Sequence, residues 1–269
     1  MTITLPNIHP TAIVEDGAKV SNSCKIGPYC CVGPEVTLDH NVCLVSHVVV
    51  SGRTFIGRGT KVWPFSSVGS EPQDLKYNGE KSTLTIGQNN LIRECVSIST
   101  GTDGGGGITS IGNNCLFMLG SHVGHDCKLG DNIIIANNSA IAGHVIIEDN
   151  VNIGGLVGVH QFCRIGEGSM IGAHAMVSKD IIPFSMIVGM RPVLSGVNLV
   201  GLKRRGSKRE DMKKLVDVFS RLFEKKGNQN FQERLEAIDK DELYQITEVQ
   251  KVIKFMKQES TRSYVAPKT

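Results

Sequence analysis

The chain has 269 residues and a mass of 29.1 kDa, which suits one large domain or a large domain followed by a smaller one. Hydrophobic residues make up 40% of it and aromatic residues only 5%, so the composition favours a folded protein whose core consists mainly of Val, Ile and Leu. Residues 1–190 hold 11 Lys and Arg against 15 Asp and Glu, a net charge of −4, whereas residues 191–269 hold 18 against 11, a net charge of +7. The basic C-terminal region favours an anionic partner.

The eight cysteines include no CxxC pair, and the neighbours Cys30 and Cys31 are poorly placed to bridge each other, so we expect reduced thiols. The first ten residues contain no basic segment followed by an apolar run. No stretch of about 18 apolar residues occurs along the chain. These features predict a soluble, cytoplasmic protein without membrane insertion.

The strongest pattern is a large apolar residue at every sixth position from Ile8 to Val68, which resumes at 86–98 and again from Ile111 to Val177. A smaller residue, often Ala, Cys, Ser or Val, stands two positions earlier. Residues two apart on a strand share a face, so each repeat predicts one short strand with a large and a small inward side chain. This period indicates a parallel β-helix, in which three successive repeats form one coil.

The repeat is interrupted at 69–85 and 99–110, two polar segments of the kind that gather on one binding face in solenoid proteins. Beyond it, Ser207 and Glu210 suggest a capping box that opens a helix running towards Gly227. Further helical patterns cover 231–239 and 242–257. We therefore predict a β-helix domain at 1–190 and a C-terminal α-helical domain at 191–269.

Four histidines fall at outward or corner positions of three successive coils: His122, His125, His144 and His160. His125, Gly143 and Gln161 are each separated by three whole repeats, so they should form one column along the helix axis. Such a cluster suits general-base catalysis by a neutral imidazole, or a zinc site with three imidazole ligands, and spacing alone does not decide between them. The chain has no GxSxG elbow, so a covalent acyl-enzyme has no support.

Five motifs, together with the repeat, resemble the UDP-N-acetylglucosamine O-acyltransferase family, whose members begin lipid A synthesis. They are SEPQDLKY at 70–77, SHVGHDC at 121–127, AGHV at 142–145, VHQF at 159–162 and GVNLVGLKRRG at 196–206. The resemblance implies a left-handed parallel β-helix and a homotrimer with active sites in clefts between subunits. It also implies transfer of a (3R)-hydroxyacyl group from acyl carrier protein to the 3-hydroxyl of UDP-N-acetylglucosamine, with no metal, no cofactor and no nucleic-acid partner.

Matching motifs carry residue roles onto this sequence. His125 is expected to be the base, Asp126 to steady its imidazole, and the Gly143 N–H to stabilise the oxyanion. Because neighbours on a strand point apart, His125 and Asp126 can interact only at a corner. The remaining expected contacts are Gln73, Asp74 and Lys76 in the first excursion; His122, His144, His160 and Gln161 in the cleft; Asn198, Arg204 and Arg205 at the nucleotide end; and Met170 and Ala173 at the end of the acyl tunnel.

Other interpretations remain open from the residues alone. A related N-acyltransferase carries an additional domain before its coils, whereas the repeat here begins at Ile8. A coenzyme A-dependent acetyltransferase fits the repeat but gives no role to the motif at 196–206. A zinc hydratase of the γ-carbonic-anhydrase type uses a similar coil and three histidines, and a purely structural solenoid leaves the clustered histidines unexplained. The chain also departs from the family pattern at Ser99, at 100–102, and at Arg191 and Val200.

Overall fold

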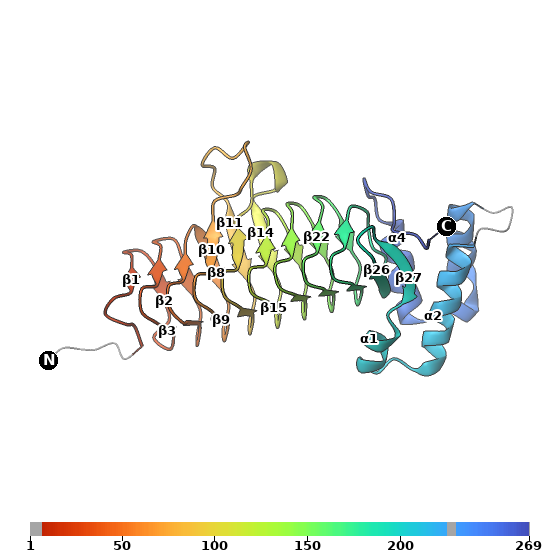
Figure 1. Cartoon of the computed structure of the whole chain (residues 1–269), viewed down its shortest axis with the longest axis horizontal. Coiled ribbons are helices and arrows are strands. Elements are labelled where there is room, and N and C mark those ends of the chain that lie inside the picture. Colours follow the sequence, from red (N-terminus) through yellow and green to blue (C-terminus); the bar gives the residue numbers. More distant parts are fainter. Residues whose placement is uncertain (1–6, 225–229, 269) are drawn as a thin grey trace.

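The computed structural model describes residues 7–224 and 230–268. Its strands wind into a long three-sided prism, with helices gathered at the C-terminal end (Figure 1). Each coil up to the last one contributes one strand to each of three sheets, which we call faces 1, 2 and 3. The prism is a left-handed parallel β-helix, which confirms the fold predicted from the hexapeptide repeat.

The strands are mostly two residues long because each side of the prism is one six-residue repeat, with one large and one small inward side chain. Face 1 contains β1 Ile13–Val14, β4 Cys31–Val32, β7 Val49–Val50, β10 Ser67–Ser70, β13 Ser97–Ser99, β16 His122–Val123, β19 Ala140–Ile141, β22 Gly158–Val159 and β25 Met176–Val177. Face 2 contains β2 Lys19–Val20, β5 Thr37–Leu38, β8 Arg53–Ile56, β11 Thr83–Ile86, β14 Ile108–Ile111, β17 Lys128–Leu129, β20 Ile146–Ile147 and β23 Arg164–Ile165.

Face 3 closes the prism and continues past its last coil. It contains β3 Lys25–Ile26, β6 Cys43–Leu44, β9 Lys61–Val62, β12 Leu91–Ile92, β15 Leu116–Phe117, β18 Ile134–Ile135, β21 Asn152–Ile153, β24 Met170–Ile171, β26 Ser185–Val188 and β27 Val193–Val197. The pair β26 and β27 is antiparallel, unlike the parallel pairs before it. The chain therefore turns back at this point and leaves the coil.

The core is the column of inward residues that the repeat predicts. Val123 pairs with Ile141 and Ile141 with Val159, so neighbouring coils lie in register at a spacing of three repeats. From Ile26 onwards, the large aliphatic side chains at the sixth positions are almost fully buried, and each contributes about 1.5–3 kcal/mol. The predicted small inward cysteines are also buried: Cys24, Cys30, Cys115, Cys127 and Cys163.

The corners of the prism bend sharply, and many bend at a residue with positive φ. Besides glycines, several asparagines adopt this left-handed conformation, which their short polar side chains tolerate. On the corner between faces 1 and 2 the residues are Asp126, His144 and Phe162, with φ of 58°, 61° and 64°. Functional side chains are therefore carried by tight corners and not by strands alone.

The two excursions project together from the prism (Figure 1). The second contains the short 3₁₀ helix η1 Asp103–Gly105, and Asp103 N donates to Glu80 Oε1 of the first at 3.3 Å. Gly101 N also donates to Thr83 O at 3.3 Å. The prediction that these segments gather on one side is confirmed.

The C-terminal helices are α1 Leu199–Arg204, α2 Arg209–Leu222, α3 Phe231–Lys240 and α4 Thr247–Lys257, with a 3₁₀ turn η2 Glu242–Tyr244 before α4. The predicted capping box at Ser207 is wrong. The N-cap of α2 is Lys208, and Ser207 Oγ instead donates to Glu248 Oε1 of α4 at 2.8 Å. The predicted extension of the helix towards Gly227 is wrong at its described end, because α2 ends at Leu222 and is capped by Phe223; residues 225–227 lie outside the described residues. The predicted helix at 242–257 is divided between η2 and α4.

No helix within the described part of the chain combines the length and apolar character needed to cross a membrane.

Candidate active site

A groove of about 520 Å³ lies along face 1 where the histidines gather. Its wall includes several of the residues predicted for the site: Gln73, His122, His125, Gly143, His160 and Gln161. The predicted column of His125, Gly143 and Gln161 is confirmed as an arrangement, because the strands before these residues are in register.

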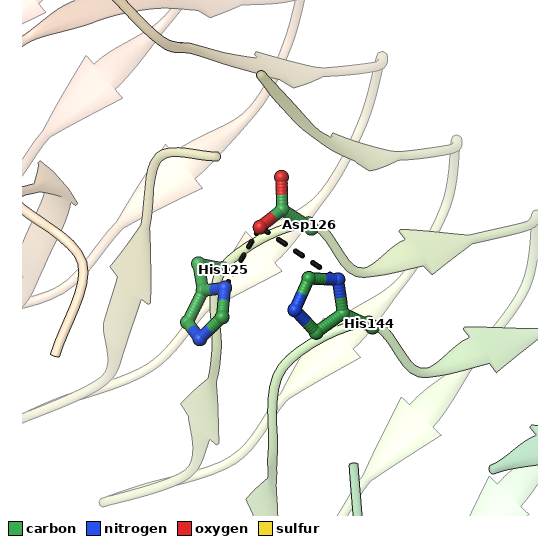
Figure 2. Close-up of side chains that lie close together, drawn as sticks. All are labelled: His125, Asp126 and His144. Carbon is green, nitrogen blue, oxygen red and sulfur yellow. Dashed lines mark hydrogen bonds and ion pairs between the residues drawn. The ribbon is translucent and has the colours of Figure 1, made fainter. Parts of the chain in front are cut away.

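His125 and Asp126 interact because the chain turns a corner between them. Asp126 has φ of 58°, and its Oδ2 lies 2.8 Å from His125 Nδ1 (Figure 2). The Asp126 side chain is fully buried, whereas the imidazole of His125 keeps 13% of its surface exposed. With Nδ1–H donated to the carboxylate, the lone pair of Nε2 remains free to accept a proton.

The second excursion holds the Asp126 carboxylate in place. Asp126 Oδ1 accepts from Thr102 N at 2.9 Å, and Oδ2 accepts from Thr102 Oγ1 at 2.6 Å. Asp126 N donates to Thr109 Oγ1 at 2.8 Å. Sequence reasoning did not identify Thr102 or Thr109, although their excursion was singled out as a functional loop. These bonds to ionised oxygens fix the carboxylate and, through it, the orientation of the His125 ring.

Gly143 packs directly against the His125 imidazole. A Cβ at this position would lie 2.6 Å from both Cε1 and Nε2 of the ring, so only glycine leaves room for it. Gly143 is buried, and its N–H has no hydrogen-bond partner among the described residues. A buried backbone donor without a partner is rare, and here it lines the groove next to a basic imidazole nitrogen.

His144 and Phe162 extend the ring cluster along the same corner. The rings of His125 and His144 meet edge to face at 4.8 Å between centroids, and His144 stacks on Phe162 at 4.4 Å. His144 Nδ1 also lies 3.8 Å from Asp126 Oδ2 (Figure 2). Burial lowers the pKa of His144, which favours its neutral ring.

His122 lies on strand β16, facing the groove. Its Nδ1 is 2.7 Å from Ser97 Oγ on β13, the neighbouring strand of face 1. Burial lowers the pKa of His122 as well, which favours its neutral ring.

One group of side chains within the described residues could hold a metal ion. It consists of His125, Asp126 and His144, whose ligand atoms lie within 4.8 Å of one another. The Oδ2 atom of Asp126 already accepts from His125 Nδ1 and Thr102 Oγ1. A metal bound there would have to replace the bond that orients His125.

The first excursion brings two predicted residues to the cluster. Asp74 Oδ2 lies 4.0 Å from His125 Nε2, and Gln73 lines the groove. Lys76 lines an adjoining hollow of about 440 Å³ with Asp74, His144 and Phe162. The loop therefore forms one wall of the site, on the side of His125 opposite to Asp126.

The comparisons with known proteins point to the same family of enzymes and together cover nearly the whole chain. The family model of UDP-N-acetylglucosamine O-acyltransferase, domain 2, matches residues 180–265, and the bacterial transferase hexapeptide model matches 108–143 and 144–179. The acyl-[acyl-carrier-protein]–UDP-N-acetylglucosamine O-acyltransferase of Agrobacterium fabrum is 42% identical over 97% of this chain and 95% of its own. The chain belongs to the UDP-N-acetylglucosamine O-acyltransferase family. The Paracoccus denitrificans enzyme of the same name is 50% identical over 77% of each chain.

Solved structures of the family have the same fold. UDP-N-acetylglucosamine O-acyltransferase of Moraxella catarrhalis is 38% identical, with a TM-score of 0.91 over 96% of this chain and 99% of its own. The Francisella novicida acyltransferase is 37% identical, with a TM-score of 0.90 over 96% and 94%.

In this acyltransferase chain, the predicted nucleotide-end residues lie outside the groove. Asn198 is the N-cap of α1; its Oδ1 accepts from Gly201 N at 3.0 Å and its Nδ2 donates to Gly168 O at 2.9 Å. Arg204 ends α1 and is exposed, and the guanidinium of Arg205 lies 5.9 Å from the centre of the Phe184 ring. The side chain of Asn198 is therefore already used to hold α1 on the last coils.

The predicted tunnel residues lie on face 3. Met170 belongs to β24 and is partly exposed, and Ala173 is exposed at the following corner. Neither lines the groove that contains His125. A single chain thus presents His125 and these two residues on different sides of the prism.

Proposed function

We propose that this chain transfers a (3R)-hydroxyacyl group from acyl carrier protein to the glucosamine 3-hydroxyl of UDP-N-acetylglucosamine, the first step of lipid A synthesis. The observation that carries the proposal is the buried Asp126 carboxylate, which orients His125 beside the unpartnered N–H of Gly143. The names of relatives that align over nearly the whole chain support the same substrates.

In the proposed mechanism, Nε2 of His125 takes the proton of the sugar 3-hydroxyl as its oxygen attacks the thioester carbonyl carbon. The Gly143 N–H donates to the oxyanion that forms. When the tetrahedral intermediate collapses, the C–S bond breaks and the thiolate of the carrier takes the proton from the His125 imidazolium. Asp126 stabilises that imidazolium throughout, and no acyl-enzyme forms.

Other residues are proposed to bind the two substrates. They are Gln73, Asp74 and Lys76 on the first excursion; His122, His144, His160 and Gln161 in the groove; Asn198, Arg204 and Arg205 at the nucleotide end; and Met170 and Ala173 at the end of the acyl chain. We further propose a homotrimer, in which a neighbouring subunit brings the last two sets to the groove. Their location outside the groove of their own chain supports this assembly.

The proposed reaction uses no metal and no cofactor of the enzyme, since the acyl group arrives on the phosphopantetheine of its carrier. The relatives' names favour acyl transfer over CO₂ hydration, the alternative left open by the histidines. We place the protein in the cytoplasm, because its eight cysteines are free and a reducing compartment keeps them so.

The test is incubation of the purified protein with UDP-N-acetylglucosamine and hydroxyacyl carriers of several chain lengths. We expect a product acylated on the 3-hydroxyl, and none when that hydroxyl is replaced by hydrogen. Measurement of the zinc content of the same preparation tests the alternative, a zinc hydratase. Stoichiometric zinc with CO₂ hydration, and no acyl transfer from any carrier, would overturn the proposal.

A further inference from the structure

The C-terminal segment, residues 258–268, returns from α4 to the prism and reaches the candidate active site. Asp180 N donates to Ser263 O at 2.9 Å, and Val265 N donates to Asp180 O at 2.8 Å. Leu194 N donates to Ala266 O at 3.0 Å. These backbone bonds attach the segment to the edge of the last coils, next to the corner that carries His160 and Gln161.

A buried ion pair anchors this segment. Arg164 Nε donates to Asp180 Oδ2 at 2.8 Å, and the two side chains are 9% and 0% exposed. Ser260 Oγ donates to the same Asp180 oxygen at 2.7 Å, and Arg164 Nη1 donates to Gln258 Oε1 at 3.0 Å. Because the pair is desolvated and shares its bonds with the segment, its geometry fixes where the following residues lie.

The anchored segment places Arg262 on the outer side of His160. Arg262 Nη2 lies 2.9 Å from His160 Nδ1 and 3.0 Å from Gln161 O. A guanidinium can only donate, so His160 Nδ1 takes part as an acceptor and the ring proton resides on Nε2. In the other tautomer, Nδ1–H would donate to the Gln161 carbonyl, which lies 3.1 Å away, and the bond from Arg262 to Nδ1 would be lost.

We propose that Arg262 is a positioning residue for His160. It fixes the tautomer in which Nε2–H is a hydrogen-bond donor to a substrate oxygen in the groove, and it holds the corner at Gln161. The proposal rests on the function proposed above, since it concerns binding in the same groove. It also gives the C-terminal region a direct part in the site, where the sequence suggested a separate helical domain.

Steady-state kinetics of Arg262→Ala, His160→Ala and the double variant test this role. We expect Arg262→Ala to raise KM for one substrate about 10-fold with a smaller change in kcat, which corresponds to the loss of one hydrogen bond. Arg262→Lys keeps a donor and should restore much of that loss. Because Arg262 acts through His160, the double variant should be no worse than His160→Ala alone.

Lys268→Ala is the matched control, because it removes a cation further along the same segment, and it should leave KM unchanged. A second readout does not depend on turnover: the imidazole ¹⁵N shifts of His160 should report an unprotonated Nδ1 in the parent protein and a mixture of tautomers in Arg262→Ala. Multiplicative losses in the double variant, or identical ¹⁵N shifts with and without Arg262, would overturn the proposal. Absence of acyl transfer with the expected ¹⁵N shifts would count against the proposed function alone.

Discussion

At the scale of single residues, the left-handed corner at Asp126 decides what His125 can do. On a regular strand the two side chains would point to opposite faces, whereas φ of 58° at Asp126 brings Oδ2 to 2.8 Å from Nδ1. The spacing of three repeats predicted that Gly143 would lie beside His125. It did not predict the corner geometry, because positive φ at a non-glycine residue depends on the surrounding coil.

The contact between Gly143 and the imidazole yields a first prediction. Gly143→Ala places a methyl group 2.6 Å from Nε2 of His125, so the ring must move away from the groove. Since this displacement affects both the proposed base, His125, and the proposed oxyanion donor, the Gly143 N–H, we expect kcat to fall by at least about 100-fold. Gly33→Ala is the control: its Cβ meets Ser51 and Val50 only at 3.5 Å and should leave kcat unchanged. Equal kcat for both variants would refute the close packing.

The burial of His122 makes stability depend on pH. Its pKa lies below the ordinary value of 6.5 because burial disfavours the charged ring. The unfolded chain therefore binds the proton first as the pH falls through 6.5, and the stability that the neutral ring contributes is lost there. We expect the melting temperature to drop less for His122→Asn than for the parent between about pH 7.5 and about pH 5.5. A drop of the same size in both would contradict this.

Other site residues were not predictable from spacing. Thr102 and Thr109 reach Asp126 from an excursion that breaks the repeat, and Arg262 reaches His160 across a sequence separation of 102 residues. Contacts of this kind depend on how the excursion and the segment after α4 fold back onto the prism. The repeat contains no information about either.

At the scale of elements, the strands were predictable and the helix caps were not. The strand positions follow from the burial of every sixth residue. In a short strand between two corners, a shift by one residue would turn this buried side chain outward, so only one register is possible. Ser207 and Glu210 have the right spacing for a capping box, yet Ser207 bonds to Glu248 because α4 packs beside the start of α2. The contact between Ser207 and α4 therefore replaces the capping box that the local sequence predicts.

A true capping box occurs at the start of α3. Asn230 Oδ1 accepts from Glu233 N at 2.9 Å, and Glu233 Oε2 accepts from Asn230 N at 2.8 Å. We expect Asn230→Ala to lower the free energy of unfolding by about 0.5–2 kcal/mol, because the backbone N–H of Glu233 loses its side-chain acceptor. Denaturant unfolding of this variant, with Ser207→Ala for comparison, checks the prediction. No change in stability for Asn230→Ala would show that α3 is held by packing alone.

At the scale of the whole molecule, charge is divided along the long axis. The coil region carries a net charge of −4 and the region from residue 191 a net charge of +7. The basic end lies beyond the last coils, where the helices gather (Figure 1). Such an asymmetry can steer an acidic carrier protein towards one end of the prism.

Salt should therefore weaken the association with acyl carrier protein. We expect Kd to rise by at least about 10-fold between roughly 20 mM and roughly 500 mM salt, because screening shortens the reach of these charges. Binding of UDP-N-acetylglucosamine, measured over the same range, separates the effect on the carrier from that on the nucleotide. A Kd for the carrier that does not change with salt would exclude steering by the basic region.

The most direct measurement is turnover by His125→Ala beside that by His40→Ala. His40 also pairs with a neighbouring aspartate, with Nδ1 2.7 Å from Asp39 Oδ1, but its side chain is 70% exposed on an early coil, so it is a matched control. We expect kcat for acyl transfer to UDP-N-acetylglucosamine to fall by at least about 100-fold in His125→Ala and to stay unchanged in His40→Ala, with similar melting temperatures. Turnover by His125→Ala within a few-fold of the parent would mean that His125 is not the base.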